Sequence, residues 1–187
     1  MEPSLTAETI VTTLPDPSER ITRAFQTIAE TRMRDLPFLN KALSVEAVGF
    51  FVWNHMWLGV LIAPWTMNLI ATPYDPRHWT HHKKGGTTPF SFPFGNYDFT
   101  LAHEPLMGAG LYGAYLMCSL FSPASQFVDH EAAHQTAREV LKTLFVVDPD
   151  HVDEFAPLNP PSLDERLKEP LSKRDFLRGR FLKKTTP

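Results

Sequence analysis

Residues 130–134 read His-Glu-Ala-Ala-His, a pattern whose residue types and spacing can support zinc chemistry. On a helix, two histidines four residues apart lie on one face and can bind zinc, while the intervening glutamate activates a zinc-bound water. A catalytic zinc site also needs a third protein ligand, and Glu154 lies twenty residues after His134. One hypothesis is therefore a zinc-dependent hydrolase in which His130 and His134 bind the metal and Glu131 is the base.

The same two histidines also fit a structural interpretation. A helical wheel places His130 and His134 on the face of Phe145, which is the face expected to meet the core. The longer zinc-protease pattern is missing, because Ala137 and Val140 stand where that pattern has glycine and histidine. We therefore prefer hydrogen-bonded histidines at the start of a helix, with the hydrolase kept as the alternative.

Other reactive side chains give weaker signals. His78, His81 and His82 have a spacing that could bind a transition metal, but no paired acids or cysteines accompany them, which favours a solvated polar loop. The single cysteine, Cys118, excludes an intrachain disulfide and any cysteine-based zinc or iron–sulfur site made by this chain alone, and its apolar surroundings favour a buried thiol. We expect no cofactor and no catalytic residue.

The segment Ser172–Arg178 resembles a twin-arginine export signal, whose pattern is Ser-Arg-Arg-x-Phe-Leu-Lys. It offers a hydroxyl at Ser172, adjacent cations at Lys173 and Arg174, and then Phe176 and Leu177. Export signals stand at an N-terminus, before an apolar stretch and a cleavage site. At this position the segment cannot act as one, so it calls for another explanation.

The elements that must position these residues follow from hydrophobic periodicity. A helix should begin near Asp16 and end near Met33, and a second should begin at the cap Asp129 and bury Ala133, Ala137, Val140, Leu141, Leu144 and Phe145. Short strands are expected over 43–51, 56–64, 66–73, 89–104 (as one or two strands) and 112–121. This layout predicts a two-layer α+β domain, in which an antiparallel sheet carries both helices on one face.

The domain organisation follows from composition. We expect a disordered leader over 1–15, one domain over 16–147, and a flexible tail over 148–187 that is first proline-rich and then basic. Of the 187 residues, 43% are hydrophobic and 21% are charged, an ordinary balance for a globular domain. Residues 171–187 carry six Lys and Arg against one acid, whereas residues 1–170 carry twelve against twenty. The acidic body argues against a nucleic-acid partner.

The sequence shows neither an N-terminal export signal nor a membrane-spanning helix. The N-terminal residues lack the basic start of an export signal, because Glu2 and Glu8 interrupt it. The most apolar stretch, Met56–Thr72, contains Pro64 and Asn68 and is shorter than a membrane helix. We expect a cytoplasmic protein that is not integral to a membrane.

Three long stretches resemble one protein family, the HybE-type [NiFe]-hydrogenase assembly chaperones, whose relatives include HupJ and HoxT. The stretches are RMRDLPFLN (32–40), EAVGFFVWNHMWLGVLIAPWTMNLI (46–70) and CSLFSPASQFVDHEAAHQTA (118–137). The resemblance implies a maturation factor without catalysis that binds the hydrogenase small-subunit precursor, which carries a twin-arginine signal. The large subunit and other maturation factors are further candidate partners. It also implies a two-layer α+β fold. A role in protecting the precursor's clusters from oxygen is a further option.

Candidate partner-binding residues follow from this expectation. Methionine and aromatic side chains adapt to variable apolar peptides, and acids can pair bidentately with arginines. The acids Asp35 and Glu46 could thus meet the arginines of the signal. The large apolar residues that either fill the core or line a groove for the signal are Trp53, Met56, Trp57, Trp65, Met67 and Phe127.

A regulatory role for the tail is a second hypothesis. Ser172, Lys173, Arg174, Phe176 and Leu177 could mimic the signal of the client and compete with it for the same groove. The proline-rich segment would act as the tether, and a tethered ligand acts at an effective concentration near millimolar if the linker spans the sites. The alternative is a basic amphipathic tail that solubilises the chain or touches a membrane surface.

Overall fold

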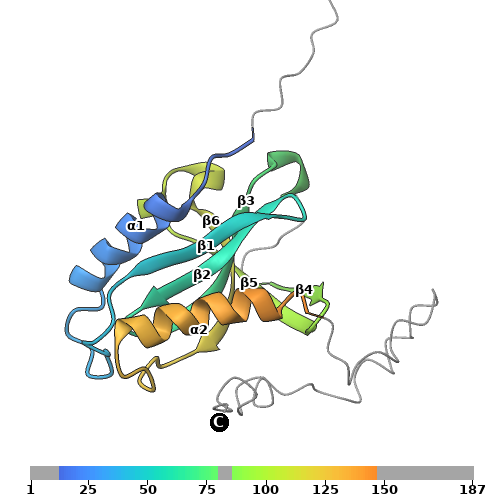
Figure 1. The fold of residues 1–187 in the computed structure, drawn as a ribbon. Coiled ribbons are helices and arrows are strands. Elements are labelled where there is room, and N and C mark those ends of the chain that lie inside the picture. Colours follow the sequence, from blue (N-terminus) through green and yellow to red (C-terminus); the bar gives the residue numbers. More distant parts are fainter. Residues whose placement is uncertain (1–12, 80–85, 147–187) are drawn as a thin grey trace, which may run out of the picture.

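The computed structural model describes residues 13–79 and 86–146, which form one antiparallel sheet with two α-helices (Figure 1). The strands are β1 Glu46–Trp53, β2 Met56–Ala63, β3 Thr66–Pro73, β4 Thr87–Phe92, β5 Gly95–His103 and β6 Ala114–Phe121. The helices are α1 Ser18–Glu30 and α2 His130–Thr143, with short 3-10 helices η1 Pro76–His78, η2 Pro105–Met107 and η3 Gly110–Gly113. The sheet order is β1-β2-β3-β6-β5-β4, and this content confirms the α+β class.

The first three strands form a meander joined by tight turns. The turn between β1 and β2 consists of Asn54 and His55, which have φ values of 46° and 62°. Two consecutive left-handed residues match the twist of a two-residue hairpin turn, and asparagine tolerates this conformation well. The turn between β2 and β3 contains Pro64 and Trp65. All three strands and the first reversal agree with the expectations from sequence.

The two helices lie on opposite faces of the sheet, so the prediction that both cover one face is wrong. In β2, Leu58, Val60 and Ile62 join the core cluster that contains the α2 residues. Leu61 and Ala63, which alternate with them, join the cluster of the α1 residues. Figure 1 shows α1 and α2 flanking the β1–β2 ribbon. The physical reason is that β2 carries apolar residues on both faces and β3 is buried on both, so each face must be covered.

Helix α1 buries the stripe that its sequence predicts: Ile21, Ala24, Phe25 and Ile28. Asp16 accepts hydrogen bonds from the backbone N–H and the hydroxyl of Ser18, at 2.8 and 2.6 Å, and so fixes the start of the helix. The helix ends at Glu30, three residues before the expected end at Met33. Leu14 precedes the helix and is buried, because its N–H donates to Tyr74 and its carbonyl accepts from the Trp57 indole. The described residues thus include 13–15, the end of the expected leader.

Helix α2 is held close to β1 by small residues on both sides. Asp129 caps the helix as predicted, accepting from the N–H of Ala132 at 2.7 Å. Ala133 and Ala137 are fully buried. On β1, Gly49 has a positive φ of 63°, which favours glycine, and a Cβ there would lie 2.8 Å from Cδ1 of Leu141 in α2. No helix of the described residues is long and apolar enough to cross a membrane.

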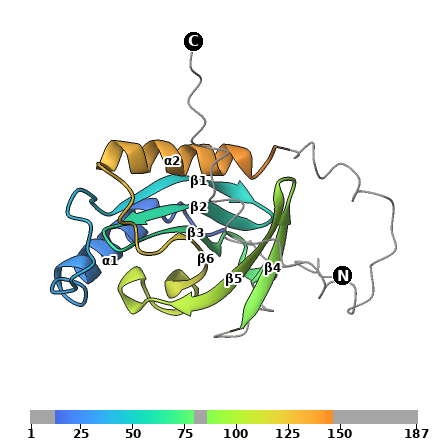
Figure 2. The same cartoon turned by 90° about the horizontal axis from the view of Figure 1, so that it is seen from below.

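The sheet curves so that its two edge strands approach each other at one end. Trp53, the last residue of β1, stacks on Phe92 of β4 with ring centroids 4.5 Å apart and planes 20° apart. The same indole meets Phe90 edge-on at 5.8 Å. In Figure 2 the β4–β5 hairpin rises toward the end of α2. One end of the curved sheet is therefore closed by aromatic rings.

Opposite-face packing predicts that the two cores respond independently to mutation. Ile21→Val in α1 should cost about 0.5–1.5 kcal/mol and Val140→Ala in α2 about 1–3 kcal/mol, because each removes buried methyl groups. In the double variant, the two losses should add within about 0.5 kcal/mol. Urea unfolding measures all three values.

A contacting pair supplies the control for this cycle. Phe51 and Phe145 meet edge to face at 5.6 Å, so Phe51→Leu and Phe145→Leu should couple by about 0.5–1.5 kcal/mol. If Ile21 and Val140 coupled as strongly as this pair, the two helices would share one core after all.

Candidate functional site

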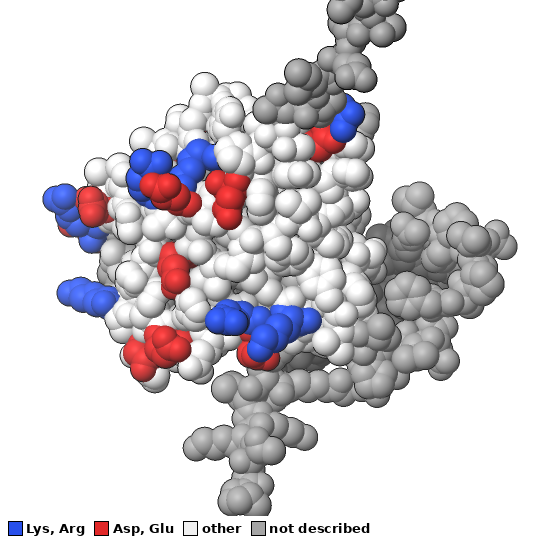
Figure 3. Space-filling model, turned by 45° about the horizontal axis from the view of Figure 1, so that its top comes forward, with Lys and Arg blue, Asp and Glu red and all other residues white. Residues whose placement is uncertain are grey.

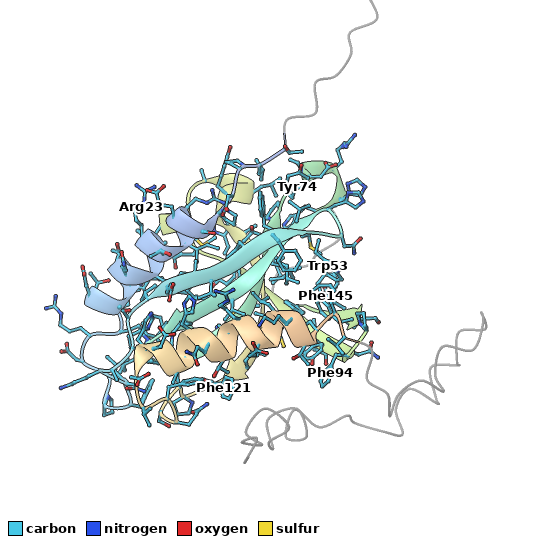
Figure 4. All side chains as sticks on the ribbon, viewed as in Figure 1. Arg23, Trp53, Tyr74, Phe94, Phe121 and Phe145 are labelled. Atoms are coloured by element: carbon cyan, nitrogen blue, oxygen red, sulfur yellow. The ribbon has the colours of Figure 1, made fainter. Side chains whose placement is uncertain are left out.

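A cluster of aromatic rings lies where α2 ends, and we call Phe51, Trp53, Phe90, Phe92 and Phe145 the aromatic patch. Phe145 contacts Phe51, Phe92 and Trp53 with ring centroids 5.6, 5.8 and 6.2 Å apart. Figure 4 shows Trp53 and Phe145 close to each other at this end of the molecule. The patch joins three elements that are distant in sequence: β1, β4 and the residues after α2.

The aromatic patch is partly open to solvent. Phe145 is 37% exposed and the following residue, Val146, is 56% exposed. Phe51, Trp53 and Phe90 are half-buried and rest on the core. A partly exposed group of large apolar side chains on a small domain is a candidate contact surface.

A cluster of polar side chains lies at the other end of β1, and we call Glu46, His130 and His134 the Glu46 cluster. The Glu46 carboxylate lies 2.8 Å from Nε2 of His130 and 3.0 Å from Nδ1 of His134. The Ser44 hydroxyl lies 3.3 Å from Nδ1 of His130. The three side chains of the cluster are each about a third exposed, at 35%, 32% and 29% for Glu46, His130 and His134. The carboxylate is thus oriented by two imidazoles but still reachable from solvent.

This geometry does not assemble the zinc-hydrolase arrangement. Glu131, the expected base, is exposed and accepts a hydrogen bond from Gln135 at 2.9 Å, away from the two histidines. Glu46 takes the place beside His130 and His134 instead. The interpretation of hydrogen-bonded histidines at a helix start describes the observed contacts.

The Glu46 cluster and the aromatic patch are connected along β1 and α2. Glu46 opens β1 and Trp53 closes it, while α2 runs beside the strand from His130 toward Phe145. Seven steps of strand correspond to about 23 Å. The molecule therefore offers a carboxylate at one end of this strand–helix pair and aromatic rings at the other.

A third group, His55, Asp75 and His78, lies where the β1–β2 turn meets the end of β3, and we call it the turn cluster. Nδ1 of His78 is 3.2 Å from a carboxylate oxygen of Asp75, and the two imidazoles stack with centroids 3.8 Å apart. Asp75 is 4% exposed and Arg77 donates to both of its oxygens. These hydrogen bonds hold the pKa of Asp75 well below its usual value, so the carboxylate is ionised.

The other predicted partner-binding residues are dispersed. Met56, Met67 and Phe127 are buried in the α2-side core, at 3%, 0% and 8% exposure. Trp57 contacts Leu14 and Tyr74, while Trp65 packs in the α1-side core at the far end of β2. Asp35 is exposed in the loop after α1. The structure thus brings Trp53 alone of the three tryptophans to the aromatic patch.

The remaining predicted residues are either buried or outside the described part of the chain. Cys118 is a buried core thiol, as expected. His81, His82, Glu154 and the whole tail, with Ser172, Lys173, Arg174, Phe176 and Leu177, lie outside the described residues. Sequence reasoning did not select Phe51, Phe90 and Phe92 for the aromatic patch; the dense aromatic run PFSFPF over 89–94 was the available signal for Phe90 and Phe92.

On the face shown in Figure 3, neither positive nor negative side chains predominate. Figure 3 shows acidic and basic groups mixed over one face, with a broad uncharged area between them. Several acids of the described residues form ion pairs within the chain, such as Glu104 with Arg32 at 2.8 Å. On this face, a partner would be recognised by individual groups rather than by a long-range field.

Comparison with known proteins identifies the family. The family model described as "[NiFe]-hydrogenase assembly, chaperone, HybE" matches residues 16–179. The chain is 36% identical to the hydrogenase expression/formation protein HupJ of Bradyrhizobium diazoefficiens, over 83% of each chain. It is 38% identical to the protein HoxT of Cupriavidus necator, over 88% of this chain and 89% of the other.

A solved structure agrees with this assignment. The solution structure of HybE from Escherichia coli matches with a TM-score of 0.56 and 26% identity, over 80% of this chain and 91% of that one. The fold and the curved antiparallel sheet thus have a counterpart among chaperones of hydrogenase assembly. The chain belongs to the [NiFe]-hydrogenase assembly chaperone (HybE) family. The resemblance inferred from three sequence stretches is confirmed.

The Glu46 cluster makes a testable contribution to stability. Glu46→Gln removes the charged acceptor shared by two imidazoles, and should lower the free energy of unfolding by about 1 kcal/mol. Glu131→Gln is the matched control, because Glu131 is exposed and its change should stay within about 0.5 kcal/mol. Urea unfolding that gave equal losses for both variants would contradict the assigned contacts.

Proposed function

We propose that this protein binds the small-subunit precursor of a [NiFe] hydrogenase and holds it until assembly is complete. Family membership is the observation that carries this proposal. In this proposal the protein acts in the cytoplasm, without catalysis, on a client that is not yet ready for export. Contacts with the large subunit or with other maturation factors are compatible with the same role.

The two ends of β1 suit the chemistry of a twin-arginine signal. Such a signal places arginines before an apolar stretch, and arginine binds carboxylates bidentately. Glu46 presents a partly exposed carboxylate, and about 23 Å away the aromatic patch presents Trp53, Phe145 and the adjacent Val146. An extended segment of about seven residues spans this length. We propose that the signal lies along β1 and α2, with its arginines at Glu46 and its apolar part on the aromatic patch.

The remaining candidate residues differ in how accessible they are to a client. Asp35 is exposed and available to a cation. Met56, Met67 and Phe127 would have to leave the core before they could touch a client, so their role in binding stays a prediction. The proposed binding surface therefore rests on residues that are already accessible.

Binding should depend on the signal and on the aromatic patch. The precursor should bind more tightly than the same subunit without its signal, measured by calorimetry or pull-down. Val146→Asp should weaken precursor binding about tenfold, because a charge replaces an apolar contact of about 1–2 kcal/mol. Glu46→Gln should weaken it as well, and should reduce the loss of affinity that added salt causes.

Matched variants separate this effect from general damage. Leu106→Asp alters another half-exposed apolar residue, in η2 on the α1 side, and should leave affinity unchanged. Glu131→Gln is the corresponding control for Glu46→Gln. Equal binding of precursor and signal-less subunit would exclude signal recognition and leave a general assembly role.

We further propose that the tail competes with the client signal. The family match extends to residue 179 and so includes the signal-like segment 172–178, although this segment lies outside the described residues. Lys173 stands where the signal has arginine, which weakens bidentate pairing and suits a ligand that must be displaced. The described residues end at Val146, next to Phe145 of the aromatic patch, and residues 148–170 can serve as a tether.

Truncation after Pro170 tests this competition. The truncated protein should bind a synthetic twin-arginine signal peptide more tightly than the full chain, because the tethered competitor is gone. The double variant Lys173→Glu/Arg174→Glu should have the same effect with the chain length preserved. An affinity that is unchanged or weaker in both proteins would instead favour a basic tail that solubilises the chain or contacts a membrane.

A further inference from the structure

The turn cluster is built from donors that transition metals prefer. His55, Asp75 and His78 each offer one ligand atom, and these atoms all lie within 4.8 Å of one another. Among the described residues, this is the only group of three histidine, cysteine or acidic side chains that meets that distance. Imidazole nitrogen with one carboxylate oxygen is a donor set typical of zinc and related divalent ions.

The backbone holds the three side chains in place. The carbonyl of His55 accepts hydrogen bonds from the N–H groups of Tyr74 and Asp75, at 3.3 and 3.1 Å, which ties the hairpin turn to the end of β3. The N–H of His78 donates to the carbonyl of Asp75 at 3.1 Å. These bonds fix the relative positions of the three residues before any ion binds.

The distances are close to those of a metal site. Two ligands at about 2.0–2.1 Å from a tetrahedral ion lie about 3.3 Å apart. Nδ1 of His78 and Oδ2 of Asp75 are 3.2 Å apart. The two imidazole planes are parallel within 5°, so one ring must turn before both can direct a nitrogen at the same ion. His55 is exposed and the His78 side chain is 46% exposed, and exposed side chains change rotamer readily.

Arg77 fixes the carboxylate and leaves it able to bind an ion. Its backbone N–H and its Nε donate to Oδ1 of Asp75, at 3.0 Å each, and its Nη2 donates to Oδ2 at 2.6 Å. Nε also lies 3.2 Å from Oδ2 and is thus shared between the two oxygens. Three N–H donors therefore engage a carboxylate that has about four lone-pair positions, which leaves one position for a metal. Hydrogen bonds of this kind commonly orient the carboxylates that bind metals.

We propose that His55, Asp75 and His78 bind a divalent transition-metal ion of the zinc class. This site shares no residue with the aromatic patch or the Glu46 cluster, where the client signal is proposed to bind. Three protein ligands leave one position of a tetrahedral ion open to water or to another donor. The site is a surface feature of a turn, so the two cores of the domain do not require the ion to fold.

Calorimetric titration of the full chain with Zn²⁺ tests the proposal. The double variant His55→Asn/His78→Ala should bind Zn²⁺ at least about tenfold more weakly at this site than the unaltered protein. Asparagine is chosen at position 55 because the residue has a positive φ of 62°, which asparagine tolerates. Circular dichroism should be the same for both proteins, because the two side chains are exposed.

Two matched double variants locate the ion. His81→Ala/His82→Ala changes the neighbouring histidines in sequence, and His130→Ala/His134→Ala changes the other close pair; both should keep the Zn²⁺ affinity of the unaltered protein. In NMR spectra, Zn²⁺ should shift the amide signals of His55, Tyr74 and Asp75. Zinc binding that His55→Asn/His78→Ala leaves unchanged, or that is lost only in one of the other two variants, would overturn the assignment.

Discussion

The strand pair β2–β3 is buried on both of its faces, and this constraint determines how the rest of the domain is arranged. Leu58, Val60 and Ile62 point to one side and Leu61 and Ala63 to the other. Since neither side can face water at acceptable cost, α1 must cover one and α2 the other. The position of α2 against β1 then places its first residues beside Glu46 and Phe145, just after its end, beside Trp53. The proposed binding surface is thus a consequence of two-sided burial.

Local features of this fold could be predicted from sequence because their causes are local. Asp129 caps α2, and Asn54 with His55 forms the first reversal, as capping and turn chemistry require. The assignment of both helices to one face failed for a different reason. A helix stripe indicates which of its own residues are buried, but not which face of a sheet they meet. The signal was present in Met56–Ala63, where apolar residues follow one another without alternation.

Long-range neighbours account for most of what sequence reasoning missed. Glu46 was selected for a partner's arginines, but its meeting with His130 and His134 depends on how α2 lies on β1. The histidines of one loop were grouped because they are close in sequence. The structure instead pairs His78 with His55, which belongs to a different turn. Trp53 and Trp57 are four residues apart, yet the hairpin turns them to opposite faces, so proximity in sequence did not imply one groove.

The irregularity of β1 has a consequence for how the protein behaves at high concentration. This strand lies at the edge of the sheet, and its pairing with β2 shifts between Val48 and Phe51, around Gly49. An edge strand with an unbroken row of backbone groups invites a second copy to add to it, and bulges interrupt that row. When apolar rings are exposed beside such an edge, copies of the chain can associate by pairing their edge strands. The bulge at Gly49 therefore protects against self-aggregation at the edge where an extended guest would be received.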